Sequence, residues 1–343
     1  MILCRKVHKL LIINALCIGF SVFCQAQKAN DANPSVGDGF EDPLAPILSP
    51  GRSAISPQEV NSTDDWSLQD MVLGYGYVGS ASLNKGFGTV TEQAAELSLI
   101  ASRRVDNQVS FLLGGNWQTF SFGYNGSNIP LPNNLQALNA ILGCDIDLDD
   151  SSESKWALHM EIDPGVYGTW QSLGWHQVNV PGVIAISQIY KDDFQWFFAL
   201  RADVFQFFPI IPVPGLRWRF GDRNEWVLNG SAPKPTLRWQ PWKDGAEYFS
   251  DLTLYAGGDI LNINARLPAS DAKSLGGRSL SGALVNYFEG RAGAGVEYQV
   301  TPELALQLEG GAVVWRSFDF FRLNDQVTST MAPYVQATIR GQF

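Results

Sequence analysis

The sequence ends in TMAPYVQATIRGQF, residues Thr330 to Phe343, and this stretch decides the fold. Apolar or small side chains occupy every second position from Pro333 to Phe343, whereas polar ones, among them Gln336, Thr338 and Arg340, lie between them. Successive side chains of a β-strand point to opposite faces, so this stretch forms a strand with one apolar and one polar face. Such a strand belongs either to the edge of a soluble β protein or to a membrane barrel.

The aromatic residue at the end of this strand favours the membrane. The stretch resembles the C-terminal strand of bacterial outer-membrane β-barrels, in which the last aromatic residue lies at the membrane boundary. In those barrels it is also the signal that the barrel-insertion machinery binds. The resemblance implies that Phe343 is an assembly signal and that the insertion machinery is a partner of this chain.

The other end of the chain looks like a secretory signal peptide. Arg5, Lys6 and Lys9 precede the apolar run from Leu10 to Phe23, and small residues allow cleavage after Ala26. The run is too short for a membrane helix, which needs roughly 17 to 25 apolar residues. We therefore expect residues 1–26 to be removed on export, which leaves Cys144 as the single cysteine and excludes an intramolecular disulfide.

Residues 27–70 differ from the rest of the exported chain. They are rich in Pro, Asp and Ser and lack apolar periodicity, which predicts a disordered periplasmic segment or, alternatively, an arm that plugs a barrel. The formal net charge is -10, so nucleic acid is an unsuitable partner. No later apolar stretch is long enough for a membrane helix, and a closed barrel is the other structure that satisfies its backbone in lipid.

From residue 71 to residue 343 the sequence alternates between apolar and polar residues, with turn residues at intervals. This pattern predicts an all-β, transmembrane, antiparallel up-and-down barrel of about fourteen strands. If two of the short strands within 206–241 are misassigned, the number becomes about twelve, which is the alternative. The predicted strands are 71–82, 92–104, 108–118, 136–148, 155–163, 178–190, 194–205, 215–221, 225–231, 235–241, 251–262, 285–299, 303–316 and 330–343.

The connections and the aromatic residues agree with this prediction. Short polar turns follow the even strands, and longer connections such as 119–135, 164–177, 263–284 and 317–329 follow odd ones, as in bacterial barrels with both termini in the periplasm. Six aromatic residues mark strand ends that would lie near one membrane interface. They are Trp156, Phe194, Phe220, Trp226, Tyr298 and Phe343.

The central part of the chain carries a family resemblance. The stretch from Pro214 to Phe220 (PGLRWRF), followed by Trp226-Val227-Leu228 and by Pro233 to Trp239 (PKPTLRW), is similar to the signature of an uncharacterised outer-membrane β-barrel family. That family is catalogued only as a domain of unknown function. The resemblance implies the fold and an outer-membrane location, and it identifies no catalytic or ligand-binding residue.

Side chains that point into the barrel are the candidates for function, because the others face lipid. The parity of the strands predicts a charged lumen, with carboxylates and arginines on different strands, which would select small polar solutes by charge. The alternative is an interior filled by ion pairs, such as Asp203 with Arg217. The candidate lumen residues are Asp145, Asp147, Glu161, Asp163, Arg201, Asp203, Arg217, Arg219, Arg238, Glu289, Arg291, Glu297, Glu309 and Arg340.

Other functions find less support in the sequence. Only His159 and His176 remain after export for a lipid-hydrolysing enzyme, and no Gly-x-Ser-x-Gly motif is present, so we expect no catalytic residues. The Asp residues around 145–149 lack the spacing of a calcium loop, so neither a metal nor another cofactor is expected. A structural or adhesive barrel that acts through its external loops is the main alternative. We predict a passive channel for small hydrophilic solutes, surrounded by lipid in the outer membrane of a Gram-negative-type bacterium.

Overall fold

A computed structural model describes residues 66–343, except 107, 151–153, 171–173, 191–192, 207, 223, 242–250 and 270–272. The predicted signal peptide and residues 27–65 of the predicted disordered segment lie outside the described residues. Strands account for nearly all regular structure, and three short 3-10 turns are the helical elements of the described part. No helix among these residues is long and apolar enough to cross a membrane.

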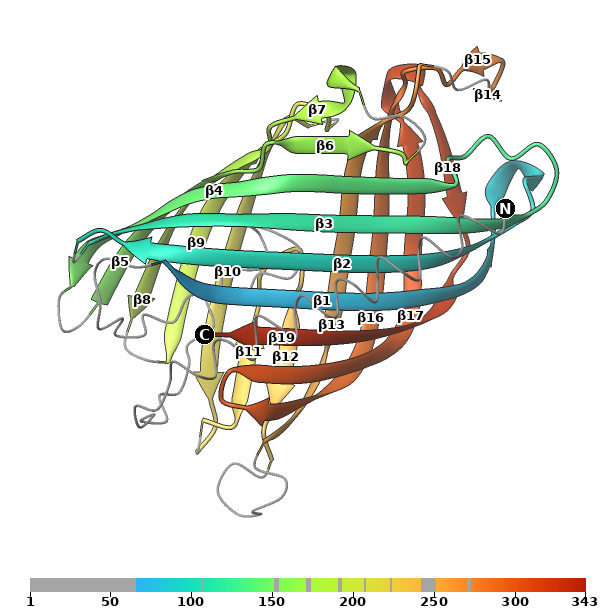
Figure 1. The fold of residues 1–343 in the computed structure, drawn as a ribbon. Coiled ribbons are helices and arrows are strands. Elements are labelled where there is room, and N and C mark those ends of the chain that lie inside the picture. The colour runs from blue at the N-terminus through green and yellow to red at the C-terminus, as the bar shows by residue number, and fades with distance from the viewer. Residues whose placement is uncertain are drawn as a thin grey trace. The chain divides into compact units, whose positions relative to one another are not determined.

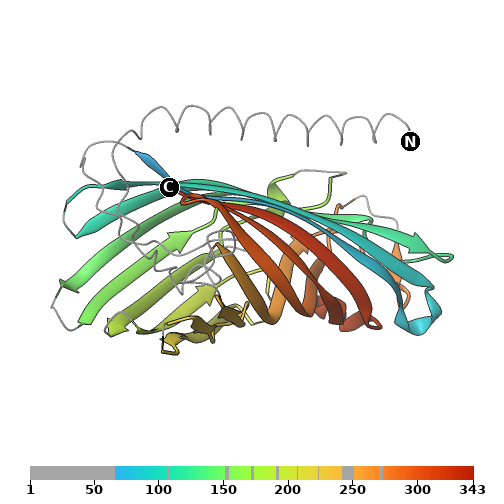
Figure 2. The ribbon, with the colours of Figure 1, turned by 90° about the horizontal axis from the view of Figure 1, so that it is seen from below.

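Fourteen antiparallel strands form a closed barrel, as the alternation predicted (Figure 1). Closure is made by the first and last strands, which pair from Asp70 opposite Gln342 to Val78 opposite Tyr334. In Figure 2 these two strands, blue and red, run together from the point marked C. The wall strands are β1 (Ser67–Ser82), β2 (Thr89–Arg104), β3 (Val109–Asn125), β4 (Asn134–Asp150), β5 (Ser154–Ile162), β8 (Gly182–Tyr190), β9 (Phe194–Ala202), β10 (Ile210–Phe220), β11 (Trp226–Asn229), β12 (Thr236–Trp239), β13 (Leu252–Arg266), β16 (Leu284–Thr301), β17 (Leu304–Phe320) and β19 (Ala332–Gln342).

The remaining short strands extend this wall or belong to its loops. β6 (Gly165–Gly168) continues β5 along β4, and β7 (Val178–Asn179) continues into β8. Prolines at 164 and 181 lie at the two interruptions. β18 (Asp325–Ser329) pairs with the end of β17, while β14 (Ser274–Leu275) and β15 (Arg278–Ser279) form a separate hairpin. We call the end of the barrel where β1 begins the turn end, and the opposite end the loop end.

The strand number is confirmed, but several predicted boundaries are wrong. β1 begins at Ser67, so residues 67–70 belong to the barrel. The predicted loop 119–135 is mostly strand, because β3 continues to Asn125 and β4 starts at Asn134. The other three long connections likewise contain β6, the end of β13, β14, β15, β18 or the end of β17. The alternation of apolar and polar residues fades toward the loop end, where both faces of a strand are covered, and this explains the underestimated lengths.

The two faces of the wall have opposite chemistry. Outward residues such as Leu138 (58% exposed), Leu308 (54%) and Val335 (49%) are apolar, whereas inward residues include buried Asp, Glu, Arg, Ser and Asn. An apolar exterior around a polar interior is the arrangement of a transmembrane barrel. The predicted aromatic girdle includes a contiguous row in which Trp226 stacks between Phe220 and Trp239, with ring centroids 6.3 and 5.3 Å apart.

One irregularity in β17 exchanges its two faces. Gly290 pairs with Trp315 and Arg291 pairs with Val313, so Val314 is an additional residue on β17. A β-bulge of this kind shifts the side-chain parity by one. As a result Arg316, which strict alternation would turn to the lipid, is fully buried inside the barrel.

The wall is uneven in height. β16 and β17 pair from Asn286 to Thr301, whereas β11 and β12 each have four paired residues. A strand needs about 9 to 11 residues to cross a bilayer, so the β11–β12 hairpin spans only part of it. β13 lies opposite β4 in the ring of strands, and part of it approaches β4 across the lumen. Its Cα atoms come within 8 Å of those of β4 and β6.

Candidate functional site: the lumen

The loop-end half of the lumen is filled by apolar side chains. Phe120 and Phe122 of β3 contact Tyr287 of β16 and Phe318 of β17 across the interior, with ring centroids 5.0 to 5.3 Å apart. Buried residues from β1, β2, β13, β18 and β19 and from the loop-end loops extend this apolar cluster. Opposite walls of the barrel are therefore in van der Waals contact at this end.

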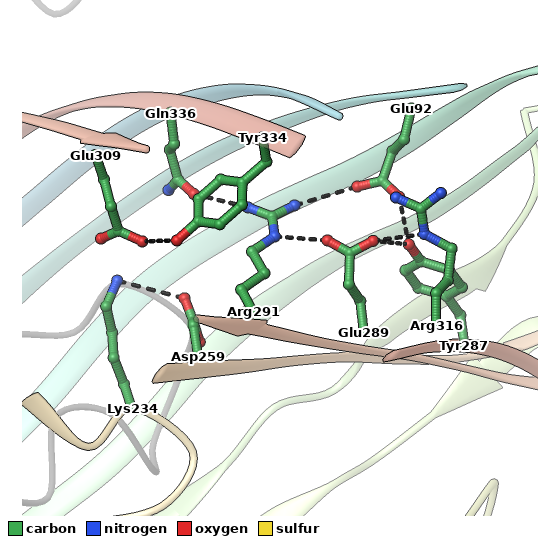
Figure 3. Close-up of polar contacts among 10 residues, drawn as sticks. All are labelled: Glu92, Lys234, Asp259, Tyr287, Glu289, Arg291, Glu309, Arg316, Tyr334 and Gln336. Atoms are coloured by element: carbon green, nitrogen blue, oxygen red, sulfur yellow. Dashed lines mark hydrogen bonds and ion pairs between the residues drawn. The ribbon is translucent and has the colours of Figure 1, made fainter. Parts of the chain in front are cut away.

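A layer of paired charges, drawn in Figure 3, adjoins the apolar cluster at Tyr287, whose ring packs in the cluster and whose hydroxyl donates to Glu289 at 2.7 Å. Arg316 Nε donates to Glu289 Oε2 at 2.7 Å and Arg291 Nε donates to Glu289 Oε1 at 2.5 Å, so one carboxylate joins two guanidinium groups. Glu92, on the facing strand β2, lies 3.2 Å from a guanidinium nitrogen of each arginine and accepts a hydrogen bond from the Tyr287 hydroxyl. These groups have no exposure or almost none, so removing one partner would leave a buried charge uncompensated.

The polar contacts continue toward the turn end from Arg291. Its guanidinium donates to Gln336 Oε1 at 2.8 Å and lies 5.0 Å from the centre of the Tyr334 ring. The Tyr334 hydroxyl donates to Glu309 at 2.5 Å, and Lys234 lies 3.4 Å from Asp259 (Figure 3). Paired residues thus line the middle of the lumen on β13, β16, β17 and β19.

Inward glycines let two tyrosines lie flat against the wall. A Cβ atom on Gly293 would be 2.3 Å from the Tyr334 hydroxyl, and one on Gly295 would be 2.5 Å from the Tyr255 ring. Neither position tolerates a side chain without displacing a ring toward the lumen axis. The glycines of β16 therefore determine how far these rings project into the lumen.

A further ion pair lies near the turn end. Glu297 of β16 accepts hydrogen bonds from Arg238 of β12 and from Gln307 of β17. Arg217 and Arg219 of β10 are inward on the same side, opposite Asn229 and Val227 of β11. Arg217, Arg219 and Arg238 therefore lie on one part of the wall, on β10 and β12.

A second polar group crosses β4 and β5. His159 is 2% exposed, its Nδ1 is hydrogen-bonded to Asp145, and its Nε2 lies 3.8 Å from Glu161 Oε2. These residues do not include a nucleophile beside a base, so the contacts form a buried polar group without the arrangement of a hydrolase triad. In the part of the chain that the structure describes, no group of three His, Cys, Asp or Glu side chains is placed to hold a metal ion.

Asp203 connects three elements at the loop end. Its carboxylate accepts from Asn179 and from Asn264 at 2.7 Å each, and from the backbone N–H of Phe205 at 2.8 Å. The predicted pair of Asp203 with Arg217 is wrong, because the register places Arg217 opposite Gln195, far along β9 from Asp203.

The other predicted lumen residues lie on the inward face, although they do not form one site. Glu289 and Arg291 belong to the charge layer, Glu297 and Arg238 pair nearer the turn end, and Asp145 and Glu161 flank His159. Asp147, whose side chain is 58% exposed, lies at the turn-end rim, 3.8 Å from Arg104. Asp163, Arg201, Arg219, Glu309 and Arg340 also occupy inward positions, and they are distributed over five strands or their extensions.

Sequence reasoning missed half of the charge layer. Glu92 has the same parity as Glu96, so the alternation of β2 could have identified it. Arg316 was hidden by the bulge, and the run Val313-Val314-Trp315, which breaks the alternation, was the available signal. Lys234 lies in the loop between β11 and β12, where parity gives no information.

Comparisons with known proteins concern the fold. No family model matches the sequence, and no curated protein matches it, so the resemblance to an uncharacterised family stays a prediction. Among solved structures, the COG4313 outer membrane channel from Pseudomonas putida F1 is 11% identical, with a TM-score of 0.41 over 83% of this chain and 100% of its own. A Pseudomonas aeruginosa FadL homologue is 9% identical, with a TM-score of 0.40 over 90% and 99%. LpxR from Salmonella typhimurium is 11% identical, with a TM-score of 0.33 over 80% and 100%.

Proposed function

We propose that this barrel is an outer-membrane channel that admits small molecules with an apolar part. The observation that supports it is the order of surfaces along the lumen, an apolar cluster at the loop end followed by a layer of paired charges. An aromatic or aliphatic group can replace the contacts between the rings of Phe122, Tyr287 and Phe318 at little cost. A hydrated ion would have to lose water there, and apolar constrictions exclude ions for that reason.

The orientation follows from bacterial barrels as a class. We expect the turn end to face the periplasm, with both termini and residues 27–65 on that side, and the loop end to face the exterior. On this view the apolar cluster meets solutes first. Beyond the cluster, the solutes pass along the inward-facing polar residues of the lumen to the periplasm. The expected role of Phe343 in assembly belongs to this same proposal.

The proposed solute class differs from the small hydrophilic solutes that the charged lumen predicts. Some of the charges that supported a hydrophilic pore are engaged with one another, as in the contacts of Glu289 with Arg291 and of Glu297 with Arg238. A charge that is already paired attracts an ion in the lumen less strongly than an unpaired charge does. In addition, the rings in contact across the loop end describe a closed channel that opens when those side chains separate.

Transport measurements distinguish the two classes. Purified protein in a planar bilayer should give no large conductance steps, and liposomes that contain it should not swell in a small sugar. Cells of a Gram-negative host that express it should take up the apolar dye N-phenyl-1-naphthylamine faster than cells that express an empty vector. Nitrocefin entry, a hydrophilic control, should not change. Large conductance steps with sugar uptake would favour the hydrophilic channel, and no uptake of either kind would favour a structural barrel.

A variant of the apolar cluster tests directly whether this cluster closes the loop end of the lumen. Replacement of Phe122 by Ser removes ring contacts to Tyr287 and Phe318 and adds a hydroxyl group, so water and ions should enter. We expect conductance steps in the variant that the unmodified protein lacks. Phe198→Ser, on the lipid-facing side of β9, is the matched control. Equal conductance of the two variants would contradict the closed apolar entrance.

A further inference from the structure

The two arginines of the charge layer differ in how completely their hydrogen-bond donors are used. All three guanidinium nitrogens of Arg291 have acceptors, because Nε donates to Glu289, Nη1 to Gln336 and Nη2 to Glu92. Arg316 donates through Nε to Glu289, and its Nη2 lies 3.2 Å from Glu92. Its Nη1, however, is fully buried and has no hydrogen-bond partner among the described residues.

This unused nitrogen points away from the carboxyl groups. A guanidinium group is planar and presents its donors in a fixed fork. Because the edge formed by Nε and Nη2 of Arg316 faces Glu289 and Glu92, Nη1 lies on the far side of the group. Figure 3 shows these contacts of Arg316, which are all made from that one edge. Neither carboxyl group can therefore accept a hydrogen bond from Nη1 in this arrangement.

Apolar side chains flank Arg316 on its own strand and on the next. Val313 and Phe318, inward on either side of it in β17, are fully buried members of the apolar cluster. Across the ladder Arg316 pairs with Ser329 of β18, and Ser329 pairs in turn with Leu83, another member of that cluster. An N–H group in such surroundings is unfavourable without an acceptor, because it has lost its contacts with water.

A solute that enters the apolar cluster could supply the acceptor. Native proteins leave few buried polar groups without a partner, so such a group needs an explanation. The formal charges of Glu92, Glu289, Arg291 and Arg316 cancel, so a carboxylate would bring an uncompensated charge into a site without exposure. A carbonyl, ether or hydroxyl oxygen accepts a hydrogen bond and adds no charge. A pure hydrocarbon would leave Nη1 as it is.

We propose that Arg316 Nη1 anchors a binding site in the apolar cluster for solutes that carry one uncharged oxygen acceptor, such as ketones, esters and alcohols. The inference rests on the proposed function, because the solute enters by separating rings such as those of Phe122 and Phe318, whose centroids are 5.0 Å apart. It adds a preference that the apolar cluster alone does not give. Among molecules with the same apolar part, the one with an uncharged acceptor binds most tightly.

Three probes of similar size and different polarity test this preference. Propiophenone, propylbenzene and 3-phenylpropanoate share a phenyl ring and a chain of equal length, and they differ in carrying a ketone, no polar group or a carboxylate. Radiolabelled probes are equilibrated with the protein in lipid nanodiscs, and each affinity is corrected for partition into empty nanodiscs. We expect propiophenone to bind about tenfold more tightly than propylbenzene, as a hydrogen bond to a charged donor predicts. Equal affinity of these two, or tightest binding of the carboxylate, would overturn the inference.

A matched pair of variants assigns the preference to Arg316. Arg316→Lys keeps a positive charge beside Glu289 and removes the Nη1 donor, so the preference for the ketone over the hydrocarbon should fall to about one. Arg291→Lys changes the same layer by the same substitution but leaves Nη1 of Arg316 in place, so the preference should remain. A preference that survives in Arg316→Lys, or that disappears equally in both variants, would contradict the assignment. Heat-modifiable gel mobility confirms that each variant is folded.

Infrared spectroscopy tests the hydrogen bond in the unmodified protein, without any variant. The carbonyl stretch of propiophenone labelled with carbon-13 should shift to lower frequency in protein-containing nanodiscs relative to empty ones. An unshifted carbonyl band from bound ketone would overturn the inference. Absence of binding by all three probes would contradict the proposed function and this inference together, whereas equal binding of ketone and hydrocarbon contradicts this inference alone.

Discussion

Strands β16, β17, β19, β1 and β2 pair along almost their whole length, whereas β11 and β12 meet their neighbours over four residues each. The long-strand side also carries most of the contacts that cross the lumen, from the aromatic cluster to the charge layer. The short-strand side contains Pro212 and Pro214 of β10 and the aromatic row of Trp226 and Trp239. The contrast indicates that the long-strand side supplies most of the stability of this barrel, whereas the short-strand side contributes less and can have short strands.

The sharpest test of this contrast is the removal of a buried charge from the long-strand side. Arg316→Leu leaves Glu92 and Glu289 with one guanidinium between them in a site without exposure. We expect a loss of about 3 to 5 kcal/mol in the free energy of unfolding, since breaking a buried pair leaves an uncompensated charge. Urea unfolding in detergent micelles, followed by tryptophan fluorescence, measures it.

The control is an arginine of the short-strand side. Arg219 of β10 is half-buried near the turn end, so Arg219→Leu should cost less than about 1 kcal/mol, as exposed ion pairs do. If the two variants lose equal stability, the two sides do not differ in the way described. The double variant Arg316→Leu, Glu92→Gln, which leaves Arg291 paired with Glu289, should recover part of the loss if the charge itself is the cause.

The apolar cluster should give the next largest effect. Phe318→Ala removes a fully buried ring that contacts Phe122 and Tyr287, with an expected cost of about 3 kcal/mol. Phe197→Ala, in the small apolar group of β8 and β9, removes an equally buried ring on the other side. Because Gly215 lies against Phe197 and allows the wall to relax, we expect a smaller loss there. The same urea titration compares the two.

The glycines of β16 should show an intermediate effect on stability, measured by the same urea titration. Gly293→Ala places a Cβ atom 2.3 Å from the Tyr334 hydroxyl, so the ring must turn into the lumen and release Glu309. An expected loss of about 1 to 3 kcal/mol is typical of overpacking. Gly290→Ala, which meets no atom closer than 3.8 Å on the outer face, should be close to neutral. Equal effects would mean that Tyr334 is not held by the wall.

The smallest effect concerns the loop end, outside the membrane. The Lys85 ammonium, hydrogen-bonded to Asp325, lowers the pKa of this carboxyl below its ordinary value. A carboxyl with a lowered pKa stabilises the fold above its ordinary pKa of about 3.9, and this contribution is lost as the pH falls through the folded-state value. Asp325→Asn should therefore lower the melting temperature slightly at pH 7 and not at pH 2. An equal decrease at both values would assign the effect to packing.

The sequence was informative wherever lipid imposes a strict period. The fourteen strands, the inward face of Arg340 and the aromatic row at Trp226 all follow from alternation and turn positions. Near the loop end this constraint weakens, because water and neighbouring loops cover both faces, and there the ends of β3 and β17 were predicted too short. Alternation also cannot reveal which inward residues meet across the lumen, so the pairing of Glu92 with Arg316 required the structure.

The bulge at Val314 divides β17 into two parts of opposite parity, because β17 holds one residue more than β16 at this place. If all the residues of β17 lay in a regular ladder, every side chain after Val314 would be on the other face, with Trp315 in the charge layer and Arg316 in hydrocarbon. Deletion of Val314 would instead join Val313 to Trp315 opposite Arg291 and Gly290, which leaves a regular ladder and keeps Arg316 inside the barrel. The extra residue thus acts as a shift of reading frame within the strand, which assigns the residues on both of its sides to the faces where their chemistry fits.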